Sequence, residues 1–268
     1  MTLKYYKTDR VSSLVEEFFH LTFDDSDLPF ESTVLPVCYT AITFIFKNQH
    51  RFIYKKKETE LSGLIVTGQF YESFQFLVEE KGHSFGMMLH PTTLYKLTKL
   101  DASKIKNKHV PLDLFSKELN DLLSPIFIEH EDNIPKLVQN LKLAILKLPS
   151  KKDSIVNKID KLIDHIHSKE GMLNTYDLLA YVEYSQKTLE NHFKKIVGLT
   201  PGKYIRLYRF VKLMRKYESN TIELKDLIHM YNYYDHSHFT RDFKHFMKQS
   251  PKDYFKSDHP FLNKYLNK

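Results

Sequence analysis

The chain has 268 residues, of which 42% are hydrophobic and 27% charged, a length and composition that suit two domains of ordinary size. The formal net charge of +7 is uneven, because residues 151–268 hold 22 Lys and Arg against 14 Asp and Glu, whereas residues 1–150 hold 18 against 19. An excess of positive charge in the second half is what neutralising DNA phosphates would need, although any basic surface would carry the same charge.

Cys38 is the single cysteine, which excludes an internal disulfide framework. Its neighbours Val37 and Tyr39 predict a buried structural thiol in a strand. The N-terminus lacks the apolar run of a signal peptide, and no apolar stretch reaches the length of a membrane span. We therefore expect a soluble cytoplasmic protein with no membrane partner.

Residues 1–129 are rich in short strand-like stretches. A helix is predicted around Val11–Phe23, and five later stretches are rich in β-branched and aromatic residues. Turn signals such as Asn48, Gly63 and Gly68 separate these stretches. The pattern predicts an α+β protein whose N-terminal domain, residues 1–150, is an antiparallel β-barrel or sandwich, cupin-like in class, with flanking helices.

Two helices are predicted at the end of this half, over Leu114–Leu123 and Ile134–Leu148. The second has an apolar stripe at clear helical spacing, which either packs on its own sheet or pairs with a second copy of the chain in a homodimer. Residues 149–152, Pro-Ser-Lys-Lys, are the predicted linker. A helix over Ile155–His167 then opens the second domain, residues 151–268.

One pattern is written twice in this second domain, with the two copies 50 positions apart. The matching pairs are Leu189 and Phe239, Phe193 and Phe243, Lys194 and Lys244, Thr200 and Ser250, Pro201 and Pro251, and Tyr204 and Tyr254. A repeat kept in register through apolar, basic and proline positions predicts two copies of one structural unit.

Each copy is predicted to be two helices joined by a short turn. Ser185 and Asp235 are good N-caps, and an apolar stripe of helical spacing follows each of them. A shorter apolar helix precedes each cap, over Tyr176–Val182 and Ile222–Met230, and Asn232 suits a left-handed turn. This is a helix-turn-helix arrangement, present twice and joined by a helix from Pro201 to Tyr217.

Two segments, SQKTLENHFKKIVGLTPGKYIRLYRFVKLM and IELKDLIHMYNYYDHSHFTRDFKHFMKQSPKDYF, resemble the double helix-turn-helix domain of the AraC family of bacterial transcription regulators. The chain departs from the family at Leu179 and Ile228, where a small alanine is usual, and at Glu183, Asn232 and Lys248, where glycine is usual. The resemblance implies an all-α DNA-binding domain, binding to a promoter or operator, and contact with RNA polymerase if the protein is an activator. It also implies a β-rich sensor half that holds a small-molecule effector or forms a homodimer.

The resemblance also places the DNA contacts on the polar outer face of each second helix. The expected base readers are Lys187, Glu190 and Asn191 in the first copy and His236, Ser237, Thr240 and Arg241 in the second. The expected phosphate contacts are Lys194, Lys195, Lys203, Lys244 and Lys252. The alternatives are structural: Glu190 pairs with Lys194, and Arg241 pairs with Asp242 or a neighbouring helix.

Neither a metal site nor a catalytic site is expected. His236 and His238 are only two positions apart on a helix, and His83 and His90, at the ends of a predicted strand, have no carboxylate at a completing spacing. No phosphate loop, nucleophile elbow or zinc-hydrolase motif occurs, so we expect no enzyme and no cofactor. The alternatives to a transcription regulator with an N-terminal sensor are an enzyme-like or metal-binding barrel tethered to DNA, and an architectural DNA binder with a vestigial sensor.

Overall fold

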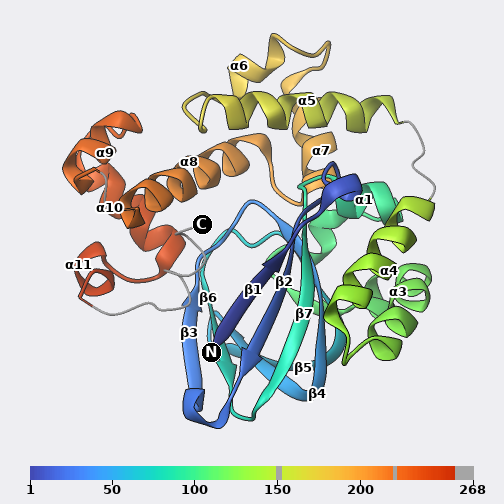
Figure 1. Cartoon of the computed structure of the whole chain (residues 1–268). Helices are drawn as coiled ribbons and strands as arrows, with labels where there is room; N and C mark the ends of the chain where they lie inside the picture. Colours follow the sequence, from blue (N-terminus) through green and yellow to red (C-terminus); the bar gives the residue numbers. More distant parts are fainter. Residues whose placement is uncertain (149–152, 220–221, 257–268) are drawn as a thin grey trace.

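The computed structural model describes residues 1–148, 153–219 and 222–256. A β-rich N-terminal half is followed by a helical half that lies across one end of the strands (Figure 1). The predicted α+β class is therefore confirmed, with an antiparallel sheet first and an all-helical domain second. The linker predicted at residues 149–152, and with it the boundary between residues 150 and 151, lies outside the described residues.

The N-terminal half contains an eight-stranded antiparallel sheet that curves like a barrel. Its main path runs β1-β2-β7-β4-β5-β8, and β3 pairs with β6, which pairs in turn with the second half of β4. An irregularity in the β4–β5 ladder between Ile45 and His50 lets β4 bend from one neighbour to the other. The strands are β1 Thr2–Tyr6, β2 Val15–Phe23, β3 Phe30–Val34, β4 Thr40–Tyr54, β5 Lys57–Thr67, β6 Phe74–Val78, β7 Gly82–Leu89 and β8 His109–Pro111.

The sheet has two covered faces, which alternate along each strand. On β4, Ala41, Thr43 and Ile45 face the interior of the curved sheet. Ile42, Phe44 and Phe46, which alternate with them, face outward. Ile42 and Phe46 belong to an apolar core there, and the ring of Phe44 stacks on that of Phe127 with 5.3 Å between the ring centres. The interior face therefore encloses a cavity, and the outer face is covered by helices.

The helix predicted over Val11–Phe23 is wrong, because residues 15–23 form strand β2 and only Asp9–Val11 form a helical turn. The spacing of three between the buried residues Val15, Phe18 and Leu21 imitates a helix. It arises because both faces of β2 are covered, and because the pairing with β7 shifts register between Val15 and Glu17.

Helices α3 and α4 cover the outer face of the sheet (Figure 1). The apolar stripe of α4 includes Leu137, Leu141 and Ile145, which are buried in the core beneath the sheet. Of the two alternatives for this stripe, packing on its own sheet is confirmed. The helix predicted at residues 114–123 begins and ends later. The helices of this half are α1 Thr93–Thr98, α2 Leu112–Phe115, α3 Lys117–Glu129 and α4 Ile134–Lys147, with short 3-10 turns η2 Asp25–Asp27 and η3 Ala102–Ile105.

The helical half is built around α8, which contributes eight buried residues to one core. The paired positions of the repeat meet there, since Leu189 and Phe239 are both fully buried, as are Phe193 and Phe243. The predicted register of the two copies is therefore confirmed. The helices are α5 Ser154–Ser168, α6 Thr175–Leu179, α7 Gln186–Val197, α8 Pro201–Glu218, α9 Leu224–Met230, α10 His236–Met247 and α11 Pro251–Tyr254.

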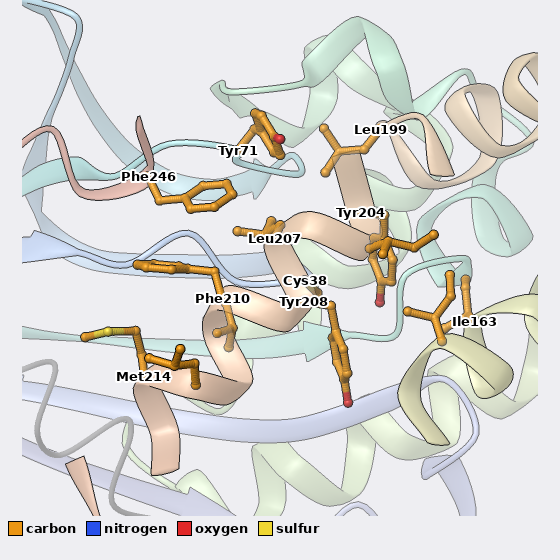
Figure 2. Close-up of a cluster of buried hydrophobic side chains, with 14 of the residues drawn as sticks. Cys38, Tyr71, Ile163, Leu199, Tyr204, Leu207, Tyr208, Phe210, Met214 and Phe246 are labelled. Carbon is orange, nitrogen blue, oxygen red and sulfur yellow. The ribbon is translucent and has the colours of Figure 1, made fainter. Parts of the chain in front are cut away.

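This core continues into the N-terminal half through Leu35, Cys38 and Tyr71 (Figure 2). The ring of Tyr71 lies 5.3 Å from that of Phe246, edge to face. Cys38 is buried, as predicted, but it lies in the loop between β3 and β4 rather than in a strand. The two halves therefore share one apolar core and do not hang together by a linker alone.

Candidate nucleic-acid interface

The first helix pair consists of α6 and α7. The side chain of Ser185 caps α7 by accepting a hydrogen bond from the backbone N–H of Thr188, at 3.2 Å. Gly198 ends the same helix with φ at 94°, a left-handed conformation that costs glycine little. Asn174 caps α6, which ends at Leu179 and is therefore shorter than the helix predicted up to Val182. Both ends of α7 are thus fixed by local sequence.

The outer face of α7 is polar and open to solvent. Lys187, Asn191 and Lys194 are exposed, whereas Leu189 and Phe193 on the inner face are fully buried. Glu190 is half-buried and accepts a hydrogen bond from Gln186 at 2.9 Å. Glu190 therefore has a structural partner on its own helix. This partner is Gln186 and not Lys194, the partner suggested by the spacing in the sequence.

The second helix pair, α9 and α10, repeats this geometry with different residues. The Asp235 side chain accepts from the backbone N–H of His238 at 2.6 Å, which confirms the predicted cap. Asn232 has φ at 54°, the left-handed turn that its sequence predicted. Lys248 takes the place of Gly198 at the end of α10, with φ at 59°. The departures at Asn232 and Lys248 thus keep the left-handed backbone.

The outer face of α10 also carries polar side chains. His236, Ser237, Arg241 and Lys244 are exposed, and Thr240 is half-buried. These residues lie on successive turns of one helix face. A helix in a DNA groove would direct such groups toward base edges and phosphates. Lys252, on α11, is exposed too.

Asp242 fixes the inner side of α10. Its carboxylate has no exposed surface and accepts a hydrogen bond from Nε of Arg206 at 2.9 Å, and another from the Tyr233 hydroxyl at 3.2 Å. A second guanidinium, from Arg209, lies 3.9 Å away. The partners of Asp242 are therefore on α8 and in the turn before α10, while Arg241 is exposed to solvent.

Two of the predicted phosphate contacts, Lys195 and Lys203, lie at the boundary with the N-terminal half. The Lys195 ammonium is 5.8 Å from the ring centre of Tyr95, and that of Lys203 is 5.6 Å from the ring centre of Tyr71. Lys106 directly follows η3, and its pKa is lowered by burial and by the nearby charges of Lys203 and Lys194. Positive charge thus gathers where the halves meet as well as on the outer helix faces.

The loop between β5 and β6, residues 68–73, is a partner of α10 that was not predicted from the sequence. The backbone N–H of Ser73 donates to the carbonyl of Phe246 at 2.6 Å, which satisfies an unpaired group at the end of α10. Glu72 pairs with Lys248 at 3.1 Å, and Tyr71 packs on His245. These contacts join residues about 175 positions apart, beyond the reach of any local pattern.

His83 and His90, at the two ends of β7, each have a structural contact. His83 stacks on Phe46 at 4.4 Å on the outer face of the sheet, and His90 bonds the carbonyl of Ser12 at the other end of β7. In residues 1–148, 153–219 and 222–256, no three His, Cys, Asp or Glu side chains come close enough together to hold a metal ion.

Comparison with known proteins finds a family model for a segment of each half of the chain. A family model described as a helix-turn-helix domain matches residues 178–257, the segment that contains both capped helices. This segment is an AraC-type helix-turn-helix domain. A second model, described as a domain of unknown function (DUF6597), matches residues 8–111, which cover most of the curved sheet.

Two curated relatives carry regulator names. An uncharacterized HTH-type transcriptional regulator of Escherichia coli (strain K12), YidL, is 24% identical over 188 residues, covering 66% of this chain and 61% of the relative. The HTH-type transcriptional activator AarP of Providencia stuartii is 28% identical over 86 residues, covering 32% of this chain and 64% of the relative. The matched segments thus span less than two thirds of the length of either relative.

Among solved structures, an apo ToxT variant from Vibrio cholerae strain SCE256 aligns with a TM-score of 0.48 at 12% identity, over 89% of this chain and 97% of the other. Wild-type ToxT with bound unsaturated fatty acid, from the same strain, aligns with a TM-score of 0.46 at 12% identity, over 88% and 92%. None of the helices in the described part of the chain is both long and apolar enough to cross a membrane.

Proposed function

We propose that this protein regulates transcription by binding a promoter or operator through two successive major-groove segments, one read by α7 and the other by α10. The observation that supports this most is the repeat: two capped 12-residue helices each present an open polar face while their inner faces share one core. The 18 residues of α8 between them span roughly 27 Å, comparable with the roughly 34 Å of one DNA turn.

In this proposal exposed residues in the first half of each helix read bases. Lys187 and Asn191 are the best candidates on α7, and Arg241 on α10, because lysine and arginine suit guanine and asparagine suits adenine. Glu190 and Thr240 are less open, and His236 and Ser237 lie at the first turn, where they reach either bases or the nearest phosphates.

The lysines divide into two groups. Lys194, Lys244 and Lys252 are exposed and supply sequence-independent affinity for phosphates. Lys195 and Lys203 rest over aromatic rings of the N-terminal half, so they reach DNA only on leaving those rings. We assign them a smaller share of the affinity.

Selection of bound sequences from a random duplex pool tests this proposal. The full-length protein at near-physiological salt should enrich a motif of two blocks about one helical turn, roughly 10–11 base pairs, apart. A double variant, Asn191→Ala with Arg241→Ala, serves as the control and should lose one conserved base pair in each block. A single block, or the same motif from the double variant, would contradict reading by two helices.

We further propose that a small-molecule effector in the N-terminal half alters DNA binding. The support is a shared wall, because Phe70 and Phe74 line the cavity inside the sheet while Tyr71, Glu72 and Ser73 between them hold the end of α10. A ligand that displaces one side of this short loop also displaces the other. The loop before β4 is built alike, since Leu35 lines the cavity and Cys38 packs in the core of the helical half.

The remaining partners are proposals as well. RNA polymerase is a partner if the protein activates transcription, and the working compartment is the cytoplasm, where bacterial DNA lies. Self-association has to use a surface other than the buried stripe of α4, and Leu143 and Leu146 on its far side are each 47% exposed. Sedimentation of wild type against a Leu143→Glu, Leu146→Glu variant tests whether a dimer forms there.

A further inference from the structure

The interior of the curved sheet encloses a cavity of about 180 Å³. Residues of every strand from β1 to β8 line it, together with the loops before β4 and before β6. For comparison, a cavity of roughly 150 Å³ in another protein accommodates benzene. The space therefore suits a molecule with a single ring and a few substituent atoms.

Aromatic rings form one end of the cavity. His109 stacks on Phe52 at 4.1 Å, and its ring lies 4.7 Å from that of Phe70 and 4.6 Å from that of Phe74. Offset and edge-to-face contacts of this kind are also what a flat aromatic guest would make with the same rings. The walls thus favour a planar apolar body.

Two polar atoms in the lining have no partner. Among the described residues, nothing bonds Nε2 of His109 or Oγ1 of Thr40, and both atoms are buried. Buried polar groups in proteins are nearly always hydrogen-bonded, and leaving one unpaired costs about 1–3 kcal/mol. These atoms are therefore the positions where a ligand would gain by bonding the protein.

The geometry of His109 narrows the ligand's polar group. Its Nδ1 lies 2.9 Å from the Thr67 hydroxyl, which is able to donate or accept, so Nε2 is left as an acceptor or a donor. A hydroxyl on the ligand satisfies either case, since it too donates and accepts. Burial lowers the pKa of His109 to about 3, so the ring is neutral near pH 7.

Charge excludes ionic ligands. No lysine or arginine is among the described residues that line the cavity, and Glu17 is its one acidic residue. A carboxylate or phosphate guest would lose its hydration with no cation to replace it, which costs several kcal/mol. The lining therefore selects for a neutral molecule.

We propose that this cavity binds a small neutral aromatic compound with one ring and a hydroxyl group, a phenol, whose ring lies against Phe52, Phe70 and Phe74 and whose hydroxyl bonds Nε2 of His109. Binding does not depend on the proposed function, and only the regulatory effect of the ligand rests on it.

Isothermal titration of the full-length protein at pH 7 tests the ligand class, with phenol as the probe and toluene and benzoate as comparisons. Phenol should bind with a stoichiometry of one and at least about tenfold more tightly than either. Toluene offers no hydroxyl to His109, and benzoate carries a charge that the lining does not match. Equal binding of phenol and toluene, or tighter binding of benzoate, overturns the proposal.

Three variants locate the site. His109→Phe keeps the stacked ring and should weaken phenol binding about tenfold while leaving toluene binding unchanged. Thr40→Val is a second removal of a polar atom, should His109→Phe unfold, and should weaken phenol binding by a smaller factor. Ala41→Leu, which fills the cavity from β4, should abolish binding of both probes. Phenol binding that is unchanged in all folded variants overturns the site.

Titration without DNA separates this inference from the proposed function. An enriched DNA motif with no phenol binding would overturn the ligand class and leave the regulator proposal standing. Phenol binding with no enriched DNA motif would overturn the regulator proposal and leave the site standing.

Discussion

Asp242 is a single buried carboxylate that ties three elements together, since Arg206 on α8 and Tyr233 before α10 both donate to it. Removing it leaves the buried Tyr233 hydroxyl without its acceptor and leaves Arg206 without its ion pair. We expect Asp242→Ala to lower the free energy of unfolding in urea by about 3 kcal/mol. Asp164→Ala, at an exposed position in α5, is the control and should change it by less than about 0.5 kcal/mol. A similar loss in both variants would mean that Asp242 has no special role.

Arg241 and Lys244 are also a residue-scale contrast, because both are exposed on α10 but have different proposed roles. Arg241→Ala should relax preference at one base pair, at a cost of roughly 1–3 kcal/mol. Lys244→Ala should weaken binding to all sequences and lower the slope of log affinity against log salt by about one. Affinity measured on the enriched site and on single-base variants, at several salt concentrations, distinguishes them. Equal losses on every sequence for both variants would count against base reading by Arg241.

At the scale of elements, the loop of residues 68–73 and the end of α10 act as one unit. Burial raises the pKa of Glu72, but hydrogen bonds from Lys55, Tyr54 and Lys248 outweigh it, so the net pKa is below the ordinary value. The ionised carboxylate is therefore the form that holds Lys248. We expect Glu72→Gln to speed amide hydrogen exchange at residues 245–248, because the left-handed turn at Lys248 loses its ion pair.

Glu79→Gln is the matched control for this prediction, since Glu79 pairs with Arg51 at the surface, away from α10. It should leave exchange at the end of α10 unchanged. Acidification should act like Glu72→Gln in the wild type, because stability that depends on a depressed carboxyl pKa is lost as pH falls through that value. Identical exchange in Glu72→Gln and wild type would remove this loop from the proposed link.

At the scale of the whole molecule, buried neutral histidines link stability to pH. Burial lowers the pKa of His50 to about 4, of His109 to about 3 and of His167 to about 4, whereas an unfolded histidine titrates near 6.5. Between these values the unfolded chain binds more protons than the folded one. The free energy of unfolding should therefore fall as pH drops from about 6.5 to 5, by roughly 1.4 kcal/mol per pH unit for each histidine at the steepest.

Urea unfolding at a series of pH values measures this slope, and the window lies above the range in which ordinary carboxyl groups titrate. His50→Phe is the control variant, because His50 contacts Phe23 and Phe76 edge to face and phenylalanine keeps that shape. In this variant the slope of the unfolding free energy against pH should be smaller by the equivalent of about one bound proton. A stability that does not change between pH 6.5 and 5 would mean that these side chains take up protons in the folded state.

The sequence by itself determined the helical half, because its signals are local. The structure contains the predicted caps at Ser185 and Asp235 and the left-handed turn at Asn232, each of which depends on a few neighbouring residues. The two copies of the 50-residue repeat each form the same local unit, so the repeat too was visible in the sequence. It also determined the class of the N-terminal half, since strand composition and turn residues are local too. The DNA-contact roles of Lys187 and Arg241 stay predictions.

Only the tertiary structure decided which faces are covered. Strand β2 was mistaken for a helix because its two faces are buried by different partners, which erases the alternation that marks a strand. The cavity and the contact of Tyr71 with Phe246 were likewise not predicted from the sequence. Both depend on side chains brought together from distant parts of the chain, and local propensity carries no information about such pairs.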